Sequence, residues 1–323
     1  MRSGPSKIAM WKSRSILLAV VIFCVLGFLS PAALLSKQTP ARSAQKAFAT
    51  PEQAAQALIQ AAENYDVSAL LEILGPDAQD LVSSDDPVSD KNRNIAVVAL
   101  AHEKQLIRDP VNLGRATLFV GNEEWPFPIP ILKQNGKWSF DSKAGREEIL
   151  FRRVGENELD AIQVCRGFVE AQHEYALEKH DGAEVNQYAQ RIISTPGKQD
   201  GLAWQNAEGS WGGPVGEQVA KALEKGYAPK GTPFHGYYFK VLKGQGPAVP
   251  LGEMDFVVEG VMMGGFALAA APAQYRVTGV QTFIVSHDGI VYQKDLGPET
   301  LKIFESMERY NPDQTWQRTD EEP

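Results

Sequence analysis

The chain has 323 residues, and its 40 Asp and Glu residues outnumber its 32 Lys and Arg residues, which gives a formal net charge of −8 at pH 7. An acidic surface repels phosphate backbones, so we expect no nucleic-acid partner. With only two cysteines, Cys24 and Cys165, a multiply disulfide-bonded scaffold and a zinc site built on several thiolates are excluded.

Residues 1–49 have the character of an export signal or a membrane anchor followed by a linker. They contain seven of the basic residues and no acidic residue, and an apolar run extends from Ile16 to Leu29. A basic segment before an apolar run stays on the cytoplasmic side of a membrane. Ala47-Phe48-Ala49 fits the small-x-small cleavage rule, so we expect cleavage there. The alternative is an uncleaved anchor, in which residues 30–35 lengthen the apolar run to about twenty residues.

Export determines the expected location and the expected charge of the remaining protein. We expect a periplasmic or secreted protein, or one anchored in the inner membrane if residues 1–49 are retained, with membrane contact through that segment only. Residues 50–323 hold 25 Lys and Arg residues against 40 Asp and Glu residues, a net charge of about −15. Cys165 is then the single thiol, and its apolar neighbours on a predicted helix indicate burial rather than reactivity.

Residues 50–142 predict a first α+β domain, with helices followed by an antiparallel sheet. Thr50-Pro51 starts one helix that runs to Tyr65, and two more are predicted, from residue 69 to 74 and from about 88 to 107. Five aspartates lie between residues 77 and 90, which we interpret as helix capping and a solvated loop rather than a calcium site.

The sheet of this domain is predicted from two local signals. Asn135-Gly136 between apolar segments is a typical hairpin turn. In residues 125–131, prolines alternate with apolar residues, so a strand there would lack N–H donors on one side and lie at the rim of the sheet. The alternative is a polyproline-like docking segment.

Residues 143–310 predict a second α+β domain in which a long helix packs on an antiparallel sheet, and residues 311–323 form a charged tail. The pattern is helical from Ser142, and Asn157 with Asp160 predicts the cap of a long helix that runs to about Lys179. A loop-rich stretch covers residues 195–216, and a helix is predicted at 217–225. Strands are predicted at 236–242, 255–262, 265–270, 280–286 and 290–296, followed by a helix at 298–309.

The sequence contains few candidates for chemistry. Residues 196–199 lack the first Gly and the Ser or Thr of a phosphate-binding loop, and residues 180–184 lack most of the acids of a calcium loop. We therefore expect no metal and no cofactor. The catalytic candidates are His235, His287 and Asp288, which would need to meet at one end of the sheet. The binding candidates are the aromatic residues Trp204, Tyr237 and Tyr238.

Several motifs resemble the bacterial family known as domain of unknown function 2950, from residue 51 to residue 316. They are Asp86-Pro-Val-Ser-Asp90, Trp125-Pro-Phe-Pro-Ile-Pro130, Gly145-Arg-Glu-Glu-Ile149, Ser194-Thr-Pro-Gly-Lys198, Asp200-Gly-Leu202, His235-Gly-Tyr-Tyr-Phe239, Thr282-Phe-Ile-Val285 and His287-Asp-Gly289. The resemblance implies an exported bacterial protein and implies no particular activity. The element order of residues 143–310 is also similar to that of pilins, by analogy only.

These observations favour an exported, non-enzymatic binding or assembly component, whose partner is another envelope protein or a surface component. The first alternative is a periplasmic hydrolase or metal-assisted enzyme that uses His235, His287 and Asp288. The second alternative is a pilin-like assembly subunit.

Overall fold

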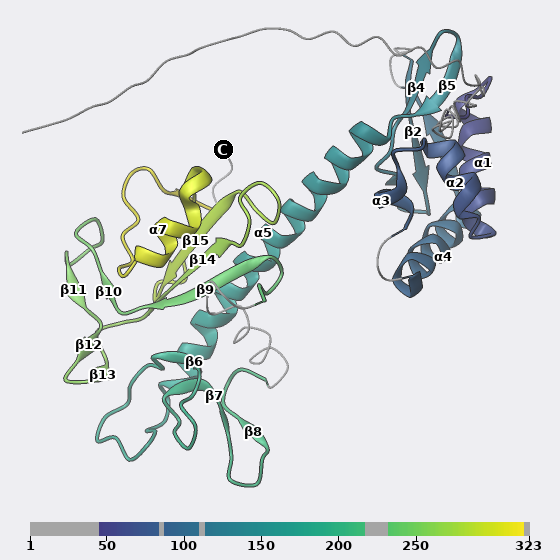
Figure 1. Ribbon diagram of the computed structural model, residues 1–323. Helices are drawn as coiled ribbons and strands as arrows, with labels where there is room; N and C mark the ends of the chain where they lie inside the picture. Colours follow the sequence, from purple (N-terminus) through teal and green to yellow (C-terminus); the bar gives the residue numbers. More distant parts are fainter. Residues whose placement is uncertain (1–44, 84–86, 110–113, 217–231, 320–323) are drawn as a thin grey trace, which may run out of the picture. The chain divides into compact units, whose positions relative to one another are not determined.

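The computed structural model describes residues 45–83, 87–109, 114–216 and 232–319 (Figure 1). Residues 1–44 of the predicted leader, Asp85 and Asp86, and the helix predicted at 217–225 lie outside these ranges. None of the helices within these ranges has the length and apolar character that a membrane span requires. The helices and antiparallel sheets confirm the predicted α+β class.

Four helices precede the first sheet, and the capping signals explain where the first two begin. The Thr50 side chain accepts a hydrogen bond from the backbone N–H of Gln53, and α1 runs over Pro51–Glu63. The Asp66 side chain accepts one from Ala69 and starts α2, Val67–Leu74. Two further helices follow, α3 (Gln79–Val82) and α4 (Pro87–Glu103). Helix α4 is shorter than predicted, because residues 105–108 form a strand.

The first sheet has the strand order β1-β2-β4-β5, with β3 also paired to β2, and every pairing is antiparallel. The strands are β1 (Gln105–Arg108), β2 (Arg115–Val120), β3 (Trp125–Pro126), β4 (Ile131–Gln134) and β5 (Lys137–Phe140). Asn135 and Gly136 have φ values of 51° and 78° and form the predicted hairpin turn. In the proline segment, Phe127 donates its backbone N–H to Leu118, as a rim position requires.

Phe48 belongs to the hydrophobic core that these elements form, which we call the N-terminal core (Phe48 to Phe140). Its backbone exchanges two hydrogen bonds of 2.8 Å with Trp138, and its side chain is 9% exposed. The Gln45 side chain also donates hydrogen bonds to the carbonyl oxygens of Ile73 and Phe140. Cleavage after Ala49 would remove these contacts, so the structure argues against the cleavage site predicted there.

Helix α5 is one continuous helix over Ser142–Tyr175, and its second half contributes to the C-terminal core. It starts at Asp141, whose side chain accepts a hydrogen bond from Ala144. The sequence predicted a start near Asn157, which is wrong because Asn157 lies in the helix interior. Its side chain instead donates to the carbonyl oxygen of Thr278 at 2.8 Å, a contact between distant segments.

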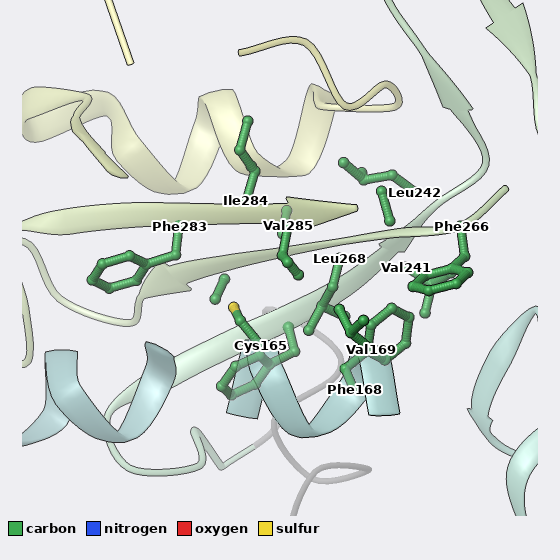
Figure 2. Close-up of a cluster of buried hydrophobic side chains, with 14 of the residues drawn as sticks. Cys165, Phe168, Val169, Val241, Leu242, Phe266, Leu268, Phe283, Ile284 and Val285 are labelled. Carbon is green, nitrogen blue, oxygen red and sulfur yellow. The ribbon is translucent and has the colours of Figure 1, made fainter. Parts of the chain in front are cut away.

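The C-terminal core (Ala161 to Tyr310) is built on a five-stranded antiparallel sheet with the order β17-β16-β15-β14-β9. Figure 2 shows Cys165, Phe168 and Val169 of α5 on one side of the sheet, while Ile284 points to the other side. There α7 (Thr300–Ser306) follows a short 3₁₀ helix (Gly297–Glu299). The strands are β9 (Tyr237–Leu242), β14 (Ala267–Pro272), β15 (Gln281–Ser286), β16 (Val291–Asp295) and β17 (Gln317–Arg318).

Cys165 is fully buried among these apolar side chains, as the sequence predicted. Burial raises the pKa of its thiol to about 12, so the reactive thiolate is not formed at neutral pH. The cysteine therefore acts as a small apolar residue of the core.

Shorter strands complete the chain. The stretch at 195–216 was predicted to be loop-rich, but β7 (Gly201–Gln205) pairs there with β6 (Arg191–Ile193) in parallel and with β8 (Trp211–Gly212) in antiparallel. The single strand predicted over 255–262 is divided into β11 (Met254–Asp255), β12 (Val257–Val258) and β13 (Val261–Met262). Strand β11 pairs with β10 (Gly244–Gln245), and β12 pairs with β13.

We predict that Phe48→Ala destabilises the protein by about 3 kcal/mol, because it removes a buried aromatic side chain from the N-terminal core. Phe151→Ala is the matched control, since Phe151 is 74% exposed, and it should change stability by less than about 0.5 kcal/mol. Chemical denaturation measures both. Equal effects of the two substitutions would show that Phe48 is not part of the folded core.

We predict that two glycines of α5 respond in opposite directions to alanine. A Cβ at Gly145 would lie 2.7 Å from Cγ1 of the buried Ile129, so Gly145→Ala should destabilise by about 1–2 kcal/mol. A Cβ at Gly155 would meet no atom within 4 Å, so Gly155→Ala should stabilise by about 1 kcal/mol through helix propensity. Thermal denaturation measures both effects. If Gly145→Ala also stabilised the protein, the close approach between Gly145 and Ile129 would be contradicted.

Candidate functional site

The sheet topology separates the two histidines that were predicted to meet. Strands β9 and β15 both pair antiparallel with β14, so they run in the same direction. His235 lies just before β9, whose first residue pairs with Pro272 at the end of β14. His287 lies just after β15, whose last residue pairs with Ala267 at the start of β14. The length of β14 separates these two ends by about 17 Å. The predicted convergence of His235, His287 and Asp288 is therefore wrong.

His235 forms an ion pair with Asp160 of α5, with 2.5 Å between Nδ1 and Oδ2. The two side chains are 48% and 39% exposed, so the pair contributes little stability by itself. His235 also adopts a positive φ of 46°, in the turn that leads into β9. The pair connects the middle of α5 to the start of the second sheet.

His287 and Asp288 form the turn between β15 and β16. The Asp288 carboxylate accepts a hydrogen bond from the backbone N–H of Ile290 at 3.1 Å, and Gly289 has a φ of 73°. The His287 Nδ1 atom lies 3.1 Å from the Ser286 hydroxyl. These contacts give His287, Asp288 and Gly289 a structural role in forming the turn.

The aromatic residues predicted to bind a partner are largely buried. Tyr237 is fully buried, donates its hydroxyl to the carbonyl oxygen of Gln281 at 2.9 Å, and has a pKa raised by burial. Tyr238 is 8% exposed. Trp204 packs edge-on against Tyr175 and beside His180. These residues build the C-terminal core rather than an open binding surface.

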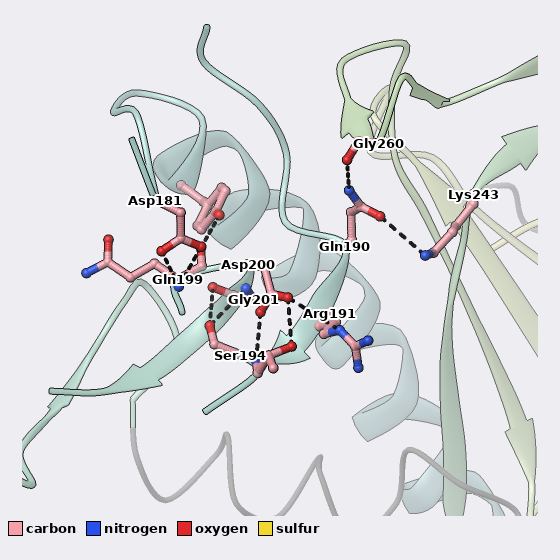
Figure 3. Close-up of polar contacts among 11 residues, drawn as sticks. Asp181, Gln190, Arg191, Ser194, Gln199, Asp200, Gly201, Lys243 and Gly260 are labelled. Atoms are coloured by element: carbon pink, nitrogen blue, oxygen red, sulfur yellow. Dashed lines mark hydrogen bonds and ion pairs between the residues drawn. The ribbon is translucent and has the colours of Figure 1, made fainter. Parts of the chain in front are cut away.

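The turn after α5 is held by polar contacts, many of which Figure 3 shows. Asp181 accepts the backbone N–H of Gln199 at 2.9 Å, and the buried His180 stacks on Tyr175 with ring centroids 3.8 Å apart. Asp200 accepts two hydrogen bonds from Thr195, at 2.7 and 2.8 Å. Within the described ranges, His, Cys, Asp and Glu form no group suited to hold a metal ion.

A groove of about 470 Å³ lies beside the C-terminal core, and His235 and Asp160 are part of its lining. Its base is apolar, with Phe168 and Leu202 among the lining residues, and Glu170 and Glu174 add negative charge. The described lining stops at Gly216 and resumes at Phe234, and residues 217–231 between them lie outside the described part of the chain.

A second pocket, of about 570 Å³, is formed by the N-terminal core and the first half of α5, and we call it the N-terminal pocket. Its lining is mainly aliphatic and aromatic, and it includes side chains from each of the first four helices. The lining residues from the helices α1–α4 are Leu58, Ile59, Ala62, Leu70, Leu74, Leu81, Val82, Asn94 and Val97. Those from the proline segment and α5 are Trp125, Phe127, Pro128, Ile129, Ile149, Arg152, Arg153 and Glu156.

Four polar residues line this otherwise apolar pocket: Asn94, Arg152, Arg153 and Glu156. Arg152 is fixed in place, since it donates to Glu148 at 2.7 Å and to the carbonyl oxygen of Pro126 at 2.8 Å. Its guanidinium also lies 5.2 Å from the centre of the Trp125 ring. The Asn94 Nδ2 atom is buried and has no hydrogen-bond partner among the described residues. An apolar pocket with a few polar groups of this kind is typical of small-molecule sites.

The sequence did not predict the N-terminal pocket. Its apolar members have the same helical spacing as ordinary core residues, and they come from separate segments between residues 58 and 156. One signal was present in retrospect: Arg152 and Arg153 stand next to each other on an otherwise amphipathic helix, facing the proline segment that was singled out as unusual.

Comparison with known proteins places the chain in one family. Residues 45–319 match the model of the family described as "Protein of unknown function (DUF2950)", so the chain belongs to this family. This confirms the resemblance that the sequence motifs indicated. No curated protein matches the chain. No solved structure matches it either, so the pilin-like analogy gains no support.

We predict a pH-dependent contribution of Asp200 to stability. Burial raises the pKa of this carboxyl group, but the hydrogen bonds from Thr195 outweigh burial and, with Arg191, hold the pKa below its usual value. A lowered pKa in the folded state stabilises the protein above the ordinary pKa of Asp, and this stabilisation is lost as pH falls through the folded value. Asp200→Asn should therefore lower the melting temperature at pH 7, with a smaller difference from wild type near pH 3.

Thermal denaturation between pH 7 and pH 3 measures this difference. Thr195→Val, which removes the hydroxyl donor, should show the same trend with a smaller amplitude. A difference that stays constant over the whole pH range would contradict the role of the ionised carboxylate.

Proposed function

We propose that the chain is an exported, non-enzymatic binding component of the bacterial cell envelope and that it holds an apolar ligand in the N-terminal pocket. The acid-free, basic leader supports export, and the acidic remainder supports a partner other than nucleic acid. The partner in this proposal is an envelope component, as the sequence suggested, and membrane contact is made through residues 1–49 if they are retained.

The observation that carries this proposal is the N-terminal pocket itself. Its volume of about 570 Å³ lies within the roughly 300–1,000 Å³ range of small-molecule sites. The pocket is partly open to solvent, so without a ligand its mainly apolar lining faces water, which is unfavourable. Binding an apolar molecule offsets that cost.

The alternative of a hydrolase has lost its main support, because it required His235, His287 and Asp288 in one place. The pair of His235 and Asp160 that the structure does contain lies in the C-terminal groove, without a nucleophile that hydrogen-bonds to the imidazole among the described residues. A pilin-like assembly role rests on element order alone. Ligand binding is the function that the geometry supports best.

We predict that a neutral apolar fluorophore such as N-phenylnaphthylamine binds to the protein and gains fluorescence in the N-terminal pocket. Val97→Phe adds a ring to the pocket lining and should weaken this binding at least tenfold. The matched control is Val164→Phe, which places the same change in the lining of the C-terminal groove and should leave the affinity unchanged. Both valines are half-buried, so the two substitutions face comparable constraints.

Fluorescence titration gives the affinities, and circular dichroism verifies that each variant is folded. Loss of binding in Val164→Phe with retention in Val97→Phe would transfer the ligand site to the C-terminal groove. Absence of saturable binding to the wild-type protein would overturn the proposed function.

A further inference from the structure

We infer that the ligand of the N-terminal pocket is a single-chain amphiphile with an oxyanion head group, either a carboxylate or a phosphate. The inference rests on the proposed function and specifies the chemistry of its ligand. The hydrocarbon chain occupies the apolar interior, and the head group lies among the donors of Asn94 and the α5 arginines.

The interior of the pocket suits a hydrocarbon chain because its walls are aliphatic and aromatic on several sides. Leu58, Leu70 and Leu74 come from α1 and α2, and Phe127 and Ile129 come from the proline segment. These five residues supply no side-chain donor or acceptor, so a polar molecule would lose its hydrogen bonds to water there without replacement. A flexible chain of methylene groups has no such loss.

Asn94 provides the first indication of the head group. Asn94 is part of the pocket lining, and its Nδ2 atom is buried and lacks a hydrogen-bond partner among the described residues. A buried donor without a partner destabilises a fold, and satisfied donors are the general rule in proteins. A ligand oxygen in the pocket would supply the acceptor.

Arg153 provides the second indication, independently of Asn94. It is exposed, lines the pocket, and has no hydrogen bond or ion pair with another described residue. Its neighbour Arg152 is held by Glu148, Pro126 and Trp125, so Arg152 adds positive charge in a fixed position. Glu156 is the one acidic residue in the lining, and two arginines outnumber it.

These groups distinguish among the possible heads of an amphiphile. An ionised carboxylate or phosphate only accepts hydrogen bonds, which matches the donors of Asn94 and the arginines. Glu148 offsets the charge of Arg152, so a quaternary ammonium head would face the positive charge of Arg153, which is unpaired among the described residues, and a hydroxyl head would gain no charge attraction. The polar lining therefore favours an oxyanion over a neutral or a cationic head.

The test measures the binding of four amphiphiles with the same twelve-carbon tail to the full-length protein, each below its critical micelle concentration. They are dodecanoate, dodecyl phosphate, dodecanol and dodecyltrimethylammonium. Isothermal titration or displacement of the fluorophore gives each affinity. We expect both anions to bind at least tenfold more tightly than the alcohol and the cation. Shortening the chain of the carboxylate should weaken binding about fourfold per methylene group.

Two substitutions test the head-group contacts separately. Arg153→Gln should lower the affinity for both anions about fivefold and leave the affinity for dodecanol unchanged, because only the charge attraction is lost. Arg166→Gln is the matched control, since Arg166 is exposed on the same helix outside the pocket. This substitution should change neither the affinity for the anions nor the affinity for dodecanol. Asn94→Leu should weaken the anions while raising the stability of the ligand-free protein, because it removes a donor without a partner.

The outcomes separate this inference from the proposed function. If dodecanol and the cation bind as tightly as the anions, and Arg153→Gln has no effect on any of them, the pocket binds apolar chains but the oxyanion head is wrong. If none of the four compounds binds, the proposed function fails together with the inference. A preference for dodecanoate or for dodecyl phosphate decides between a fatty acid and a phosphorylated lipid as the source of the head group.

Discussion

The close packing of one helix, α5, against two different sets of partners is the constraint on which the rest of the fold depends. At its start, Gly145 approaches Ile129, and Arg146 forms an ion pair with Asp80, so this end lies against the N-terminal core. At its end, Cys165 and Phe168 are buried under the second sheet. Without a disulfide, burial supplies most of the stability, so the residues of α5 that pack on each core are decisive.

The same constraint explains why the pocket is found in the N-terminal core. The C-terminal core is built from a regular sheet with α5 on one face and α7 on the other, and its inward positions are filled by large side chains such as Phe239, Phe266 and Phe283. The N-terminal core is covered instead by four separate helices and a proline segment that cannot extend the sheet on its outer side. The pocket lies among these elements, and Arg152 and Arg153 of α5 are part of its lining.

The sequence predicted structural features that depend on neighbouring residues. It did not predict those that depend on contacts between distant segments. The Asn135-Gly136 turn and the Thr50 cap were correct, because each depends on the backbone preferences of a few neighbouring residues. Of the strand predicted over residues 125–131, only Trp125–Pro126 forms a strand before β4 begins at Ile131. Asn157 was predicted to cap a helix because such residues favour helix starts. In the structure Asn157 instead bonds to Thr278, a partner far away in the sequence.

The candidate site depends even more on contacts between distant segments, which the sequence does not reveal. His235 and His287 each stand at a strand end, but only the pairing with β14 shows that these ends are opposite. The N-terminal pocket was not predicted, because a leucine that lines a pocket and a leucine that fills a core have the same pattern in the sequence. The adjacent arginines are visible in the sequence, but the buried amide without a partner among the described residues requires coordinates to recognise.

The position of the first core also connects the ligand proposal to the leader. The apolar run ends at Leu29, and the first described contact of the N-terminal core is made by Gln45. Sixteen residues reach at most about 55 Å when fully extended. A leader retained in a membrane would therefore tether Gln45 at no more than that distance from the end of the apolar run. Cleavage upstream of Gln45 would leave the contacts of Gln45 and Phe48 with the N-terminal core in place.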